Sequence, residues 1–405
     1  MRLKDITIFS PQYVGDNIDG DVSFVPMESL RNGTIDYKTI PFLKAKGKYT
    51  YFGNQDLLIA KVTPCFENGN IAIARNLLNG IGFGSSEIFV LRPNKEVISQ
   101  YLFYLSQSRD FQDKACATMC GVGGLKRISP LFMRTYEFDM PSIENQQRMV
   151  TYLDTKLSEI EHQVSLLTSK RDAYLRLKKS IINHAVTRGL DPNVKMKDSG
   201  IEWIGEVPEH WEVKRMKDIC ALSPNIKSCS EYEYGSYLPM EGLRLDQIET
   251  SDELVSTLQG KYTPFEDNDL LVAKVTPCFE NGNIAIAKGL TNGVGFGSSE
   301  IFVLRANKYN NIRFLFYMSL SSKFQDKACA TMCGVGGLKR ISPLFMKTYI
   351  MAIPPSTEQN AIATYLDDKC SKIETIVSNL DKQISRYGDL KRSLIDEVIT
   401  GKRAV

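Results

Sequence analysis

Apolar side chains recur every three or four residues along two long stretches, over residues 157–185 and 370–398. This spacing is typical of helices that pair in a coiled coil. Arg171 and Lys178 interrupt the first stripe, and Lys391 interrupts the second. The predicted seam of the helix pair consists of Leu157, Ile160, Val164, Leu167, Tyr174 and Ile181 on the first helix, and Ile373, Val377, Leu380, Ile384, Tyr387 and Leu394 on the second.

A single apolar stripe on each helix must be covered, and the other helix of the same chain is the simplest partner. We therefore expect an intramolecular antiparallel pair. About 45 residues at 1.5 Å per residue give each helix a length of roughly 65–70 Å. Ser356 with Gln359 forms a capping-box pattern at the start of the second helix, whereas Gly189 and Pro192 end the first.

The segments outside these helices mix short strands with a helix. Residues 56–62, 70–74 and 87–91 are apolar runs rich in β-branched residues and bounded by Gly, Asn or Pro, which predicts strands. Residues 97–112 carry apolar positions at helical spacing and predict one amphipathic helix. The globular module is therefore predicted to be α+β.

The chain is an internal duplication with an offset of 213 residues. Residues 60–74 recur unchanged at 273–287, and residues 111–133 recur unchanged at 324–346. A period this long indicates duplicated domains, not a solenoid. Two explanations fit the identity of these blocks: either both modules present the same surface to the same ligand, or recent recombination has made the copies alike.

Composition and charge exclude some classes of protein but do not identify the function. The 405 residues include 50 basic and 47 acidic side chains, a formal net charge of +3 that permits nucleic-acid binding without arguing for it. No apolar run approaches a membrane span, and the start lacks a signal-peptide core, so we expect a cytoplasmic protein with no membrane contact. Nine cysteines without zinc-ligand spacing fit reduced thiols and predict no metal site.

Two polar loops in each module carry candidate DNA contacts. The loop between two predicted strands contains Lys61, Asn68 and Asn70 in the first module, and its identical copy contains Lys274, Asn281 and Asn283. Lys and Asn are suited to base edges, although Asn-Gly is also simply a good turn.

A Gly-rich segment, residues 120–127, provides the second candidate loop. It ends in Lys126 and Arg127, which recur as Lys339 and Arg340. The segment fits neither common nucleotide-binding glycine motif, and it also reads as a tight turn with solvated charges.

The sequence shows none of the catalytic motifs expected of a DNA-modifying or DNA-cleaving enzyme. The three histidines, His162, His184 and His210, do not recur between the modules, which excludes a histidine-based site common to both. The sequence contains no aminomethyltransferase motif of the Asn-Pro-Pro-aromatic type and no clustered nuclease centre.

Three segments carry a family resemblance: the connector at residues 197–212, the junction at residues 354–359 with 362–373, and the ending at residues 390–402. With them, the chain resembles the specificity subunit of type I restriction-modification systems over essentially its whole length. The domains then are two target-recognition domains, each followed by a helical spacer, with a connector between the two halves: residues 1–141, 142–192, 193–213, 214–354 and 355–405.

The resemblance implies a non-catalytic subunit without a cofactor of its own. Its partners are double-stranded DNA with a bipartite site, two modification subunits that methylate adenine N6, and restriction subunits that complete an ATP-dependent endonuclease. The two modules of this chain are unusually alike, so a pseudo-twofold arrangement predicts a palindromic or near-palindromic interrupted target. The family pattern places a connector-like segment before the first module too, and this sequence starts without one, so we expect either a misplaced start codon or a naturally short N-terminus.

Two other classes remain open at this point. One is a stand-alone architectural or regulatory DNA-binding protein that uses its helices to space two domains. The other is a self-sufficient methyltransferase or nuclease, which would need a cofactor site that the sequence does not show.

Overall fold

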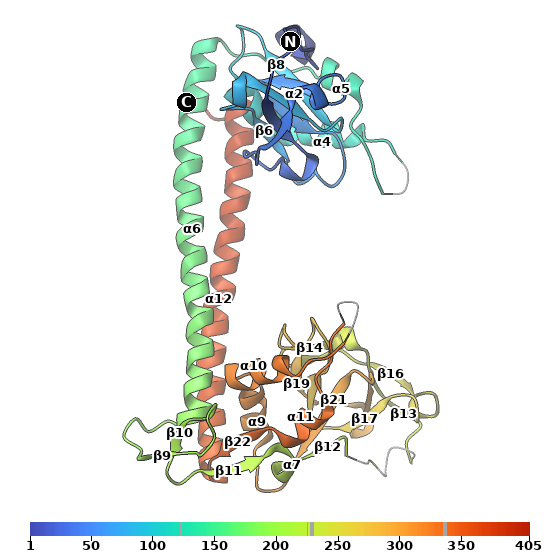
Figure 1. Ribbon diagram of the computed structural model, residues 1–405, viewed down its shortest axis with the longest axis vertical. Helices are drawn as coiled ribbons and strands as arrows, with labels where there is room; N and C mark the ends of the chain where they lie inside the picture. The colour runs from blue at the N-terminus through green and yellow to red at the C-terminus, as the bar shows by residue number, and fades with distance from the viewer. Residues whose placement is uncertain (122–123, 225, 227–230, 335–337) are drawn as a thin grey trace. The chain divides into compact units, whose positions relative to one another are not determined.

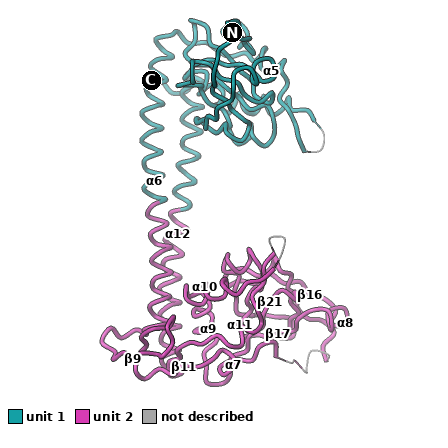
Figure 2. Tube along the Cα trace, in the orientation of Figure 1, with its two compact units in different colours: residues 1–168, 381–405 teal, residues 169–380 magenta. Residues whose placement is uncertain are grey.

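The computed structural model describes residues 1–121, 124–224, 226, 231–334 and 338–405 (Figure 1). The chain divides into two compact units (Figure 2). The first unit consists of residues 1–168 and 381–405, and the second of residues 169–380. Each unit thus contains one globular module together with one part of each long helix.

The first module is built on two four-stranded sheets. One is antiparallel, in the order β1-β8-β5-β6, and the other, β3-β2-β7-β4, contains one parallel pair, β2 with β7. The central strand β5 is buried along its whole length because every one of its side chains is apolar. The strands are β1 Thr7–Phe9, β2 Asp21–Val25, β3 Lys38–Pro41, β4 Thr50–Gly53, β5 Leu57–Ala60, β6 Ile71–Ile73, β7 Ile81–Gly84 and β8 Ile88–Pro93.

Short helices complete this module. They are α1 Leu3–Ile6, η1 Met27–Ser29, α2 Phe42–Ala45, η2 Leu78–Gly80, α3 Ser99–Gln107, α4 Arg109–Ala117 and α5 Pro130–Thr135. The sequence predicts one helix over residues 97–112, but the structure has two, α3 and α4, so this prediction is wrong. Ser108 has an extended backbone, and its hydroxyl accepts a hydrogen bond from the Phe111 N–H, so it ends α3 and caps α4.

The second module repeats this architecture, with sheets β12-β21-β18-β19 and β16-β13-β20-β17. The register also repeats, since Leu57 pairs with Ile73 and Leu270 pairs with Ile286. Its elements are α7 Met216–Ile219, β12 Cys220–Leu222, β13 Tyr234–Leu238, η4 Met240–Gly242, β14 Leu243–Arg244, β15 Gln247–Ile248, β16 Ser251–Leu254, α8 Val255–Leu258, β17 Thr263–Glu266, β18 Leu270–Ala273, β19 Ile284–Ile286, η5 Thr291–Gly293, β20 Val294–Gly297, β21 Ile301–Ala306, α9 Ile312–Ser319, α10 Ser322–Ala330, α11 Pro343–Thr348 and β22 Ile350–Ile353.

The two predicted long helices are α6, Ile143–Arg188, and α12, Ser356–Ile399. In the first unit, the beginning of α6 shares an apolar cluster with the end of α12, through residues such as Leu157 and Leu394. In the second unit, the end of α6 shares a cluster with the beginning of α12. The helices are therefore antiparallel within each unit, and all twelve predicted seam residues are buried or half-buried. The α+β fold class with paired long helices is confirmed.

The polar residues that interrupt the seam form ion pairs. Lys178 binds Glu374 of α12 at 2.6 Å in the second unit, and Lys391 binds Glu161 of α6 at 2.7 Å in the first. These two pairs occupy equivalent positions under the 213-residue offset. Each of these two lysines thus has a charged partner on the opposite helix, which lets it lie beside the apolar stripe.

A buried glutamine holds the start of each long helix to its module. The Gln146 side chain accepts a hydrogen bond from the Ile98 N–H and donates to two carbonyls. Its equivalent, Gln359, accepts from the Asn311 N–H and donates to the Pro354 carbonyl. The Gln359 side chain therefore forms hydrogen bonds with the module. This tertiary contact replaces the predicted capping box with Ser356.

The connector is ordered and packs on the second unit. It contains the hairpin of β9, Met196–Asp198, with β10, Glu206–Pro208, and it leads into β11, Glu212–Arg215, which pairs with β22. Trp211 is fully buried, and its indole N–H donates to Glu358.

None of the described helices could cross a membrane, because none is both long and apolar enough. The described residues also include no group of three or more His, Cys, Asp or Glu side chains that could hold a metal ion.

Candidate DNA-recognition site

The two predicted polar loops, about 60 residues apart in sequence, lie against each other in the first module. The Thr63 N–H donates to the Lys126 carbonyl at 3.0 Å, and the Lys126 N–H donates back to the Thr63 hydroxyl at 3.0 Å. The Ile128 N–H also binds the Lys61 carbonyl. We call residues 61–70 with 118–128 the first loop pair; its residues 122–123 lie outside the described residues.

The second module repeats this contact. The Thr276 N–H donates to the Lys339 carbonyl at 3.0 Å, and the Lys339 N–H donates to the Thr276 hydroxyl at 3.1 Å. Residues 274–283 with 331–341 form the second loop pair, of which residues 335–337 lie outside the described residues. Two segments that are identical between the modules thus form one composite surface in each.

The shape of each Gly-rich loop depends on a close backbone approach. Cys120 and Arg127 exchange two backbone hydrogen bonds, which close the loop between them. A Cβ atom at Gly121 would lie 2.1 Å from the Leu125 carbonyl oxygen, and the same holds at Gly334. Only glycine fits at these positions, so the loop closes tightly just before Lys126.

The arginine of each loop pair is held by a carboxylate that the sequence analysis did not single out. Both nitrogens of the Arg127 fork bind Glu87, at 2.9 and 3.0 Å, and this lowers the pKa of Glu87. Arg340 binds Glu300 in the same way, with the same effect on the pKa of that glutamate. The glutamates fix the arginine side chains and also neutralise part of their charge.

The strand-side lysines are half-buried. Lys61 Nζ donates to the Ser86 carbonyl at 2.6 Å and lies 4.8 Å from the centre of the Phe89 ring. Lys274 makes the equivalent contacts with Ser299 and Phe302. Burial lowers the pKa of both lysines. These side chains are therefore tied to the module, whereas Lys126 and Lys339 are exposed.

The asparagines divide into two groups. Asn68 and Asn281 are exposed, but Asn70 is only 6% exposed and Asn283 only 9%. The Asn70 N–H binds the Cys65 carbonyl, and the Asn70 carbonyl accepts from the Ala60 N–H, so this residue closes the loop. Burial therefore gives Asn70 and Asn283 a structural role and leaves Lys126, Arg127, Asn68 and their copies as the surface candidates.

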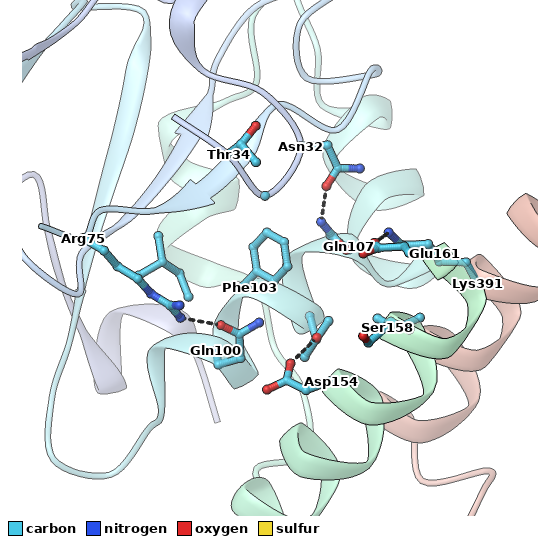
Figure 3. Close-up of a pocket in the computed structure, with 14 residues that line it drawn as sticks. Asn32, Thr34, Arg75, Gln100, Phe103, Gln107, Asp154, Ser158, Glu161 and Lys391 are labelled. Atoms are coloured by element: carbon cyan, nitrogen blue, oxygen red, sulfur yellow. Dashed lines mark hydrogen bonds and ion pairs between the residues drawn. The ribbon is translucent and has the colours of Figure 1, made fainter. Parts of the chain in front are cut away.

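A polar cavity of about 510 Å³ lies elsewhere in the first unit, between α3 and the two long helices (Figure 3). Its side chains are already paired with each other: Arg75 with Gln100, Gln107 with Asn32, and Tyr104 with Asp154. In the second unit, Arg313 replaces Gln100 and binds both Asp246 and Asp367. The cavity is thus a point at which the two units differ, unlike the loop pairs.

The comparison with protein families matches both halves of the chain. Residues 8–166 and 208–386 match the family described as type I restriction modification DNA specificity domain. The chain belongs to this family. Each of the two matches contains one loop pair, so the composite surface occurs once in each specificity domain.

Individual specificity subunits are similar to parts of the chain or to most of it. The EcoEI specificity subunit of Escherichia coli is 29% identical over 48% of this chain and 33% of its own length. The EcoAI subunit of the same species is 32% identical over 44% and 31%. The match thus spans about a third of the length of these two relatives. The MjaVIII subunit of Methanocaldococcus jannaschii is 20% identical over 96% of this chain and 88% of its own.

Solved structures share the fold. A chain of a type I R-M system aligns with a TM-score of 0.76 at 15% identity, covering 100% of this chain and 97% of that one. The HsdS subunit from Thermoanaerobacter tengcongensis aligns with a TM-score of 0.55 at 15% identity, covering 100% and 96%.

Proposed function

We propose that the chain is a non-catalytic DNA sequence-recognition subunit of a type I restriction-modification complex. The observation that carries this proposal is the recurrence of the same loop pair, residue for residue, in two specificity domains. Each loop pair contains an exposed lysine, an arginine held by a glutamate and an exposed asparagine. Lysine and arginine suit phosphates and guanine edges, and asparagine suits adenine.

Each module would read one half of a bipartite site on double-stranded DNA in the cytoplasm. The proposed domains have the boundaries expected from the sequence: recognition domains over 1–141 and 214–354, helical spacers over 142–192 and 355–405, and the connector over 193–213. Because the loop pairs match, the two half-sites should be alike and lie on opposite strands, which makes the target palindromic or nearly so. The long helices would set a fixed spacer between them.

The chemistry would belong to other chains. We propose two modification subunits that methylate adenine N6, and restriction subunits in the larger complex, as partners of this chain. The charge of +3 is small for a DNA-binding protein, which favours a subunit that shares its DNA contacts with partners.

The test is a map of methylated adenines in cells that express the chain with its modification subunit. We expect methylation at two like half-sites on opposite strands, separated by a constant spacer. Two unrelated half-sites would contradict the proposal that both modules recognise the same sequence. Methyl transfer by the purified chain alone would contradict the non-catalytic role.

A double variant assigns the loop pairs. Lys126→Ala with Lys339→Ala removes one exposed cation from each module, so we expect weaker DNA binding and a salt slope reduced by about 2, one unit for each lost phosphate contact. The variants Lys4→Ala with Lys217→Ala, at equivalent exposed positions outside the loop pairs, serve as the control. Unchanged binding in the first variant would leave Lys126 and Lys339 as turn residues.

A further inference from the structure

One surface segment has opposite charge in the two modules, although the loop pairs are identical. Residues 31–50 contain five basic and one acidic side chain. The equivalent residues 244–263 contain two basic and four acidic side chains. The two modules have thus diverged in charge over this segment, although their loop pairs are unchanged.

Three lysines of the first module account for half of this difference. Lys38, Lys44 and Lys46 are replaced in the second module by Ser251, Thr257 and Gln259. We call these three lysines the lysine edge. All three are exposed, and so are the three replacements. The divergence is therefore confined to solvent-facing positions, where packing does not select the residue type.

The lysine edge follows the outer border of a sheet. Lys38 begins β3, the edge strand in the order β3-β2-β7-β4, while Lys44 lies on α2 and Lys46 directly follows it. In the second module, the edge strand β16 instead carries Asp252 and Glu253, both exposed.

The start of this edge lies at the same end of the sheet as the first loop pair. Lys38 pairs with Phe24, and the next residue of β2, Val25, accepts a hydrogen bond from the Ser85 N–H. Two residues beyond Ser85 is Glu87, which holds Arg127 of the loop pair. A DNA strand that contacts the loop pair can therefore continue along β3.

The dimensions also fit a phosphate backbone. The four residues of β3 span about 13 Å at 3.3 Å per residue. One DNA strand rises 3.4 Å per nucleotide, so this length corresponds to about four phosphates. Lys38 lies at one end of this length, and Lys44 and Lys46 follow its other end.

The present contacts of these lysines are weak competitors. Lys38 lies 3.4 Å from Glu28 with both side chains more than half exposed, and Lys46 donates to the neutral Asn17 side chain. Exposed ion pairs contribute about 0–1 kcal/mol, so a phosphate can replace them.

We propose that the lysine edge binds backbone phosphates beside the half-site of the first module, and that the second module lacks this contact. This inference rests on the proposed function. Its consequence is that two like half-sites are bound unequally, because three phosphate contacts of the first module have no counterpart in the second. Specificity is shared equally, because the loop pairs are the same.

The test exchanges residues between the modules. The triple variant Lys38→Ser, Lys44→Thr, Lys46→Gln gives the first module the side chains of the second. Binding of the full chain, in complex with its modification subunits, to a 40-bp duplex of random sequence is measured from 50 to 200 mM salt. Three lost phosphate contacts should reduce the slope of log K against log salt by about 2.7, equivalent to roughly 40-fold over this range.

The reciprocal variant is the matched control. Ser251→Lys, Thr257→Lys, Gln259→Lys should raise the salt slope, since it creates the same edge on the second module. A salt slope that stays unchanged in the first triple variant, while the unaltered chain binds, overturns this inference alone. No binding of the unaltered chain with its modification subunits at 50 mM salt overturns the proposed function as well.

Discussion

The two units differ most in what covers one edge of the module. In the second unit, β22 pairs along all four of its residues with β11, and the connector places Trp211 in the core behind it. In the first unit, the equivalent residues 137–140 are met by a single bridge from Arg2 to Glu137 and by Met1 at Phe138. Similar modules can thus depend on different neighbours for their stability.

This edge of the first unit borders a cavity of about 350 Å³. The Tyr101 side chain lines it, and its buried hydroxyl has no hydrogen-bond partner among the described residues. Burial and the nearby Asp139 raise the pKa of this hydroxyl. The second unit has Phe314 at this position, fully buried and without a polar atom to satisfy. The comparison therefore extends from the strand edge to the core.

Trp211 anchors the connector in the core of the second unit, and its removal should have the largest effect on stability. Trp211→Ala leaves a large cavity in the core of the second unit, for which we expect a loss of about 3–5 kcal/mol in the free energy of unfolding. Urea unfolding followed by circular dichroism measures the loss. Hydrogen exchange should accelerate in β22 and stay unchanged in residues 137–140.

The other tryptophan is the control for this experiment. Trp203 is 39% exposed and contacts Lys327 through its ring face, so Trp203→Ala should cost about 1 kcal/mol or less. Equal losses in both variants would mean that Trp211 is not a specific anchor.

A smaller effect of opposite sign is expected in the first unit. Tyr101→Phe removes a buried hydroxyl that has no partner, and this should stabilise the unit by about 1 kcal/mol. Slower hydrogen exchange in α3 would show the gain. The reciprocal Phe314→Tyr should destabilise the second unit, because it buries a hydroxyl where the apolar ring of Phe314 now packs. A loss of stability in Tyr101→Phe would contradict the absence of a partner.

The local pattern of apolar residues predicts many of the helices and strands, but it does not predict which elements pack against each other. The helix seam was predictable because its period alone separates buried from exposed positions. The sheet β3-β2-β7-β4 was not predicted, since β3 is mostly exposed and lacks an apolar run. The break at Ser108 was missed because helical spacing continues through it.

The candidate site was predicted in part. Identity between the copies pointed to both loops, but their contact depends on backbone hydrogen bonds of Thr63, which no side-chain pattern shows. Glu87 was missed because it lies 40 residues before Arg127, although its recurrence as Glu300 was a usable signal. Asn70 was selected because its residue type suits DNA, but its burial depends on tertiary packing, which the sequence pattern does not show.

The smallest expected effect concerns a feature that the two units share, the ion pair between the arginine of each loop pair and its glutamate. Arg127 and Arg340 lower the pKa values of Glu87 and Glu300, so each pair stabilises the fold above the unfolded carboxyl pKa. This contribution is lost as the pH falls through the lowered pKa of the folded state. Each pair is partly exposed and screened by solvent, so we expect only a small contribution from each.

Glutamine substitutions measure this contribution. In urea unfolding between pH 6 and 3, the double variant Glu87→Gln, Glu300→Gln should lose less stability on acidification than the unaltered chain, since its amides do not titrate. Each single variant should show half of the difference, because the two loop pairs have the same contacts. If only one single variant changed the stability, the strength of the arginine–glutamate ion pair would depend on the segments packed against the module and not on the sequence of the loop pair.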